Sequence, residues 1–260
     1  MRERGSRVPI IAAMVANFCV AAAKFVAAGI TGSSAMISEG IHSLADSGDS
    51  TLLLIGHRLS RRPPDQDHPF GHGKELYVWA HVVAVLIFAV GAGMSLYEGI
   101  EHIRRPSPLQ RPVWSYSVLG VAFVFEIVSW VFAYREFRHT MHGRTFWESI
   151  QSAVDPSSVA VLLEDSAALV GLVLAAAGTA LTHVTGQPIW DGGASVLIGL
   201  LLAGVAVILI TVSRRLLIGQ AADRETIDRV KRIVLEVPAS IALLRSRHFA
   251  HPPLHPDDRE

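Results

Sequence analysis

Long apolar stretches alternate with short polar segments along most of the chain. The six longest stretches are Val8–Ile30, Ala35–Gly56, Tyr77–Ile100, Val113–Tyr134, Ser158–Leu181 and Trp190–Val212. A helix needs about 20 mostly apolar residues to cross the hydrocarbon core of a bilayer. The pattern therefore predicts an all-α, polytopic membrane protein with six transmembrane helices.

The positive charges between these stretches predict how the helices cross the membrane. The N-terminal tail and the second and fourth loops contain ten Lys and Arg residues, whereas the first, third and fifth loops contain three. Because Lys and Arg are enriched in short cytoplasmic loops, we expect both termini to face the cytoplasm.

The pattern changes after the sixth stretch. Asp223 is a candidate N-cap, and apolar residues at helical spacing follow it as far as Val237. Residues 239–260 are polar, rich in Pro and His and without periodicity, which predicts a disordered tail. We therefore expect a six-helix transmembrane domain at 1–213, the start of a cytoplasmic domain at 214–238 and the tail at 239–260.

Composition and charge narrow the possible functions. Only 18% of the residues are charged, against about 25% in ordinary soluble domains. The 23 basic residues balance 23 acidic ones, so the net charge gives no argument for a nucleic-acid partner. The single Cys19 excludes an intramolecular disulfide framework and a zinc module built from cysteines.

Polar side chains inside the second stretch are candidates for metal binding. His42 and Asp46 are four residues apart, so a helix brings them to one face, and Asp49 continues the same stripe. An imidazole and a carboxylate at this spacing can bind Zn²⁺. The alternative is a hydrogen bond between His42 and Asp46 that satisfies both groups without a metal.

Two adjacent carboxylates, Glu164 and Asp165, interrupt the fifth stretch. Their burial in hydrocarbon is costly unless protons, water or a cation compensate them. Lys24 is the one basic residue well inside a span, and we expect it to extend toward the membrane surface. Glu126 in the fourth stretch is a candidate for the same cavity or for a proton path, or bonds Ser129 on its own helix.

The second loop contains another candidate site. Asp65, His68 and His72 would converge to bind a metal if the segment turned helically. The alternative is a solvated polar loop without a metal.

Three segments together resemble the cation diffusion facilitator family of divalent-metal transporters. Residues 32–46 read GSSAMISEGIHSLAD, residues 63–65 read PPD, and residues 68–74 read HPFGHGK. Residues 162–168, LLEDSAA, are similar to the branch that contains the zinc transporter 9 proteins.

The resemblance implies a homodimer that exports Zn²⁺ in exchange for protons and is not an enzyme. It implies a transport site that carries over to His42, Asp46 and Asp165, and a loop site that carries over to Asp65, His68 and His72. Mn²⁺, Fe²⁺, Co²⁺ and Ni²⁺ remain alternative substrates, and no prosthetic group is expected. We expect the protein in the plasma membrane of a bacterium. A membrane metal-binding scaffold without transport and an intramembrane metalloenzyme remain alternative functions.

The sequence departs from the family pattern in two places. Val161 stands where typical members have a His or Asp ligand. Glu164 is the candidate that supplies the missing ligand, and Asp49 is a candidate for a position beside the site. A helix turns about 100° per residue, so Glu164 and Asp165 flank the direction in which Val161 points. The cytoplasmic domain of the family is shortened here, and we expect a truncated reading frame.

Overall fold

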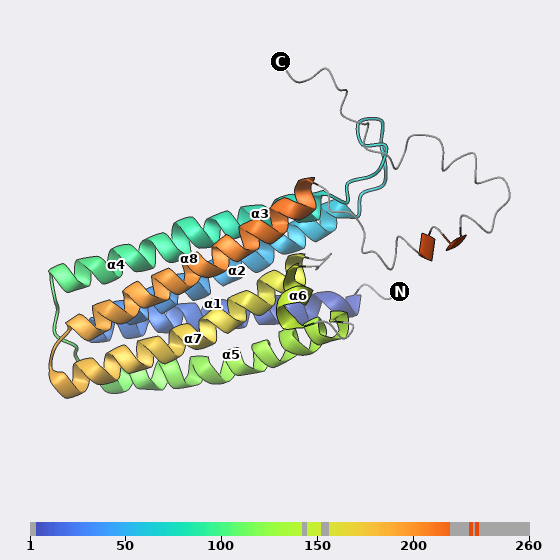
Figure 1. Cartoon of the computed structure of the whole chain (residues 1–260). Coiled ribbons are helices and arrows are strands. Elements are labelled where there is room, and N and C mark those ends of the chain that lie inside the picture. The colour runs from blue at the N-terminus through green and yellow to red at the C-terminus, as the bar shows by residue number, and fades with distance from the viewer. Residues whose placement is uncertain (1–3, 142–144, 152–155, 219–228, 231, 234–260) are drawn as a thin grey trace, which may run out of the picture. The chain divides into compact units, whose positions relative to one another are not determined.

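The computed structural model describes residues 4–141, 145–151, 156–218, 229–230 and 232–233 (Figure 1). The predicted tail lies outside these residues, and so does the predicted helix after Asp223 except for the helical residues 229–230 and 232–233. The domain boundaries stay a prediction.

Every regular element of this described part is helical, which confirms the all-α, polytopic prediction. The elements are α1 (Arg4–Thr31), α2 (Ser34–Ser60), α3 (Glu75–Leu86), the π-helical turn η1 (Ile87–Ala92), α4 (Gly93–Arg104), α5 (Pro112–Thr140), α6 (Phe146–Gln151), α7 (Pro156–Thr185) and α8 (Ile189–Ile218). Each of the six apolar stretches lies within one long helical segment, and α3, η1 and α4 together form the third.

Four of these segments are long and apolar enough to cross a membrane. They are Glu75–Arg104, Pro112–His139, Pro156–Thr185 and Ile189–Ile218, and the shorter segment Asn17–Thr31 is also an apolar helix. Helix α2 is less apolar because Glu39, Asp46 and Asp49 interrupt it. Its polar side chains are covered by neighbouring helices, as shown below.

Two features of the helices were not predicted. The π-helical turn interrupts the third segment, and α6 forms a short additional helix before α7. Apolar periodicity does not distinguish a π turn from an α turn over six residues, because both keep the backbone hydrogen-bonded within the segment. Helix α6 has only six residues, which are too few to give a recognisable helical period in the sequence.

Glycine residues end two of the helices. Gly32 follows α1 with φ +72° and Gly186 follows α7 with φ +69°. Their N–H groups donate to Ala28 and Thr182 carbonyls, each over 2.8 Å. Glycine adopts this left-handed conformation without steric cost, so the chain reverses directly into α2 and α8.

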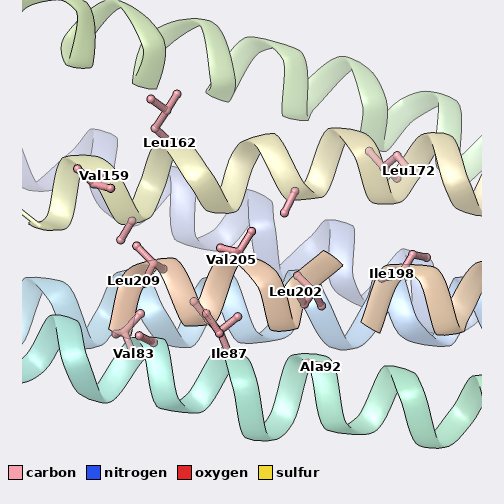
Figure 2. Close-up of a cluster of buried hydrophobic side chains, with 14 of the residues drawn as sticks. Val83, Ile87, Ala92, Val159, Leu162, Leu172, Ile198, Leu202, Val205 and Leu209 are labelled. Carbon is pink, nitrogen blue, oxygen red and sulfur yellow. The ribbon is translucent and has the colours of Figure 1, made fainter. Parts of the chain in front are cut away.

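The apolar core includes buried side chains of α1, α2 and α5, but a large part of it lies between α3, η1, α7 and α8. Figure 2 shows their side chains meeting, with Val83 and Ile87 facing Leu202, Val205 and Leu209. Helices α4 and α8 approach closely because small residues face each other: a Cβ added at Gly99 would lie 2.8 Å from the Gly192 carbonyl oxygen. Large apolar side chains such as Phe18 and Val124 are exposed, as expected for surfaces that face lipid.

The start of α2 is held by a side chain from α8. Asp191 accepts hydrogen bonds from the Ser33 hydroxyl over 2.6 Å and from the Ser34 N–H over 2.5 Å. The Ala35 N–H donates to the same carboxylate over 3.3 Å, and His102 of α4 lies 3.8 Å from it. Asp191 therefore satisfies free N–H groups at the N-terminus of α2 and ties α2 to α8.

Candidate metal centre

His42 and Asp46 lie one helical turn apart on α2. His42 Nδ1 is 3.3 Å from Asp46 Oδ1, and the His42 side chain is 3% exposed. His42 Nε2 is buried without a hydrogen-bond partner among the described residues. The pair is therefore in contact as predicted, but the contact leaves one imidazole nitrogen available to bind a metal or accept a proton.

Across from this stripe, α7 contributes Glu164. One carboxylate oxygen from each of Asp46, Asp49 and Glu164 lies within 4.8 Å of the others. Asp49 is 2% exposed and Glu164 is 5% exposed. Asp49 Oδ2 and Glu164 Oε1 form no hydrogen bond with any described residue. These three side chains, hereafter the carboxylate cluster, come from α2 and α7 and are all acidic.

Asp165 lies next to this cluster but faces α5. The Ser129 hydroxyl of α5 donates to Asp165 Oδ2 over 2.8 Å. Among the described residues, Asp165 and His42 are not part of the 4.8 Å group. The predicted four ligands are thus arranged as the pair His42–Asp46, with Glu164 near Asp46 and Asp165 held toward α5.

Glu126 and Val161 complete the surroundings of the site. Glu126 is close enough to His42, Asp46 and Asp165 for their charges to interact. The prediction that Ser129 bonds Glu126 finds no support, since Ser129 donates to Asp165. Val161 packs against the apolar core, as its side chain requires.

The expectation that the Lys24 side chain extends toward the membrane surface is wrong. Lys24 is fully buried, and its Nζ donates to Glu39 Oε2 over 2.9 Å and to the Ser43 hydroxyl over 2.7 Å. Glu39 packs directly against Gly171 of α7, where an added Cβ would collide with Glu39 Oε1. Because a nearby carboxylate compensates the ammonium group, Lys24 has no need to reach water.

Sequence reasoning missed this ion pair although a signal was present. Lys24 and Glu39 lie at nearly equal distances on either side of Gly32, where the chain reverses. Residues placed in this way face each other when two consecutive helices pack as an antiparallel hairpin.

The loop after α2 brings Asp65, His68 and His72 together. His68 Nδ1 lies 3.1 Å from Asp65 Oδ1, and His72 Nε2 lies 3.4 Å from Asp65 Oδ2. One ligand atom from each of the three lies within 4.8 Å of the others. The spacing of these residues predicts that they converge only if the segment turns helically, but the segment is not helical. Turns place the side chains instead, with the Gly71 N–H donating to the His68 carbonyl over 2.9 Å.

Asp65 is prepared to act as a charged ligand. The His68 backbone N–H donates to Asp65 Oδ1 over 2.6 Å. This hydrogen bond, assisted by the His68 side chain, lowers the pKa of the Asp65 carboxyl below its ordinary value. Asp65 therefore stays ionised in mildly acidic solution, where an ionised carboxylate is what a divalent cation requires.

Comparison with known proteins decides the family. The model of the cation efflux transmembrane domain matches residues 10–218. The chain belongs to the cation efflux family. This membership confirms the resemblance to cation diffusion facilitators.

Several relatives in the cation efflux family are similar over most of the chain. The proton-coupled zinc antiporter SLC30A9 of Xenopus laevis is 36% identical over 82% of this chain and 38% of its own length. Metal tolerance protein C4 of Arabidopsis thaliana is 34% identical over 90% of this chain and 52% of its own length. The manganese efflux system protein MneP of Bacillus subtilis is 26% identical over 96% of this chain and 82% of its own length. The chain therefore spans about two-fifths of the SLC30A9 protein, and the zinc transporter 9-like branch is confirmed.

Proposed function

We propose that the chain moves a divalent cation, with Zn²⁺ as the first candidate, out of the cytoplasm in exchange for protons. The observation that carries the proposal is the unpartnered imidazole nitrogen of His42 beside the buried carboxylates of Asp46 and Glu164. The names of the SLC30A9 and MneP relatives, a zinc antiporter and a manganese efflux protein, support the same class of substrate.

The chemistry of these groups couples the cation to protons. An imidazole binds metal only when neutral and a carboxylate only when ionised, so a cation displaces protons when it binds. Protons that reach the same groups from the opposite side of the membrane displace the cation. If the site opens to one side at a time, an inward proton gradient drives the cation outward.

The proposed transport site consists of His42, Asp46, Asp165 and Glu164. Glu164 supplies the fourth ligand that Val161 cannot provide, and its carboxylate is already near Asp46. Asp165 would turn from Ser129 toward the cation, because a bound divalent charge attracts the carboxylate more strongly than a hydroxyl does. Glu126 and Asp49 are proposed to line the proton path or to stand beside the site.

The remaining proposals concern the molecule in its membrane. Asp65, His68 and His72 are proposed to bind a second metal outside the transport path. We place both termini in the cytoplasm, expect a homodimer and expect the plasma membrane of a bacterium. Mn²⁺, Fe²⁺, Co²⁺ and Ni²⁺ remain candidate substrates because affinity order and cellular supply both decide which ion is carried.

Flux in proteoliposomes tests the antiport. Asp46→Ala and Asp165→Ala should each abolish cation-dependent proton flux while the protein still inserts into the vesicles. Glu98→Gln on α4, which removes a carboxylate outside both clusters, should transport like the unchanged protein. Transport at the normal rate by either alanine variant would reject the proposed site. Metal binding without flux in the unchanged protein would identify a scaffold.

A further inference from the structure

Two of the three carboxylates in the cluster, Asp49 and Glu164, have no positively charged partner in the described part of the chain, and Asp46 pairs only with the imidazole of His42. None of the ion pairs formed there involves Asp49 or Glu164. Lys24, the buried base nearby, already donates to Glu39 and Ser43. Three acidic groups this close and this buried cannot all be ionised unless positive charge is supplied from outside the protein.

Two carboxylate oxygens without hydrogen-bond partners indicate where a positively charged ion would bind. Asp49 Oδ2 and Glu164 Oε1 are buried and form no hydrogen bond, and both side chains belong to the group held within 4.8 Å. Buried polar atoms in folded proteins nearly always have a partner. A divalent cation coordinated by the cluster would supply a partner for both atoms at once.

We propose that Asp46, Asp49 and Glu164 form a second cation position, distinct from the one at His42 and sharing Asp46 and Glu164 with it. The proposal deepens the proposed function, since it assumes that a divalent cation enters the membrane domain. It assigns Asp49 as a direct ligand. All donors of this position are carboxylate oxygens, which suit harder cations such as Mn²⁺, whereas the imidazole of His42 favours Zn²⁺.

The position of the cluster along the helices gives it a role in the path of the ion. Asp49 lies three residues nearer than Asp46 to the loop end of α2, and Glu164 lies in the first half of α7. Figure 1 shows α2 ending on the side of the helical unit where α7 begins. A cation that enters from this side therefore meets Asp49 and Glu164 before it reaches His42.

Metal binding to the purified full-length protein tests the proposal without any transport. We would use the His68→Ala and His72→Ala background to remove the loop ligands, and measure Mn²⁺ by electron paramagnetic resonance and Zn²⁺ by calorimetry. Asp49→Asn should weaken Mn²⁺ binding by roughly tenfold or more and leave Zn²⁺ affinity nearly unchanged. His42→Ala should do the reverse, and Asp46→Asn should weaken both. Glu98→Gln is the matched carboxylate control.

The outcomes separate this inference from the antiport. Unchanged Mn²⁺ affinity in Asp49→Asn would overturn the second position, and so would an equal loss of both metals, which would indicate a single shared site. Retained Zn²⁺ binding in Asp49→Asn shows that the variant is folded. Selective loss of Mn²⁺ in a protein that gives no flux would reject antiport and leave the second position standing.

Discussion

Lys24 and Glu39 form an ion pair from which water is excluded on every side. Both side chains are 0% exposed, and Ser43 completes the contacts of the ammonium group. Removing one partner of such a pair leaves an uncompensated buried charge, which costs more than the pair itself contributes. The pair therefore makes the packing of α1 against α2 depend on the presence of both residues.

This dependence predicts a non-additive pair of substitutions. Lys24→Met should destabilise the protein by about 3–5 kcal/mol, because Glu39 loses its counter-charge. The double variant Lys24→Met with Glu39→Gln should recover most of that loss. Thermal unfolding in detergent measures both.

Two comparisons make this prediction specific. Arg105→Met breaks an exposed pair with Glu101 and should cost about 0.5 kcal/mol or less. Gly171→Ala should also destabilise, because its Cβ collides with Glu39 Oε1, whereas Gly204→Ala on α8 has open space. If the double variant were less stable than Lys24→Met alone, the charges would not be acting as a pair.

At the scale of the elements, α2 carries the candidate ligands His42, Asp46 and Asp49, and the position of its first turn depends on α8. The Asp191 carboxylate accepts from the Ser33 hydroxyl and from the Ser34 and Ala35 N–H groups. These contacts fix the start of α2 relative to α8. The regular rise of the helix then sets how far along the helix axis His42 and Asp46 lie from that start.

Loss of the cap should be measurable. Asp191→Asn replaces one accepting oxygen by an NH₂ group, so a hydrogen bond at the start of α2 is lost, and we expect a cost of about 1–3 kcal/mol. Thermal unfolding measures it. The control Ser117→Ala removes an exposed hydroxyl that bonds only its own helix, and should have little effect. Equal stability of the two variants would mean that Asp191 does not hold α2.

At the scale of the whole molecule, the two candidate metal sites lie in different environments. The candidate transport site lies among α2, α5 and α7, whereas Asp65 and His68 of the candidate loop site are about half exposed. The candidate loop site lies outside the helices, so we expect that metal bound there would not block the proposed path through them.

The double variant His68→Ala with His72→Ala should therefore bind one metal ion fewer and retain part of the flux. Elemental analysis of the purified protein gives the stoichiometry, and proteoliposomes give the flux. His57→Ala removes an exposed histidine near the end of α2 and serves as the control. A double variant with unchanged stoichiometry would show that the loop only connects α2 and α3.

The sequence by itself determined the helices and the family. Each apolar stretch is long enough to span the membrane, and backbone hydrogen bonding in lipid leaves a helix as the solution for such a segment. The motifs of residues 32–46 and 63–74 identified the family, and helical spacing placed His42 beside Asp46. All of these are local properties of the chain, which is why they could be predicted.

Only the tertiary structure decided which polar groups meet. It paired Lys24 with Glu39, directed Asp165 to Ser129, brought Glu164 to Asp49 and joined Asp191 to a helix that starts 157 residues earlier. A helix that is apolar on all sides, such as α5 or α8, carries almost no periodic signal for the face it turns inward. The rotation of each helix is set by side-chain packing and by buried hydrogen bonds with other helices, and those partners exist only in the folded chain.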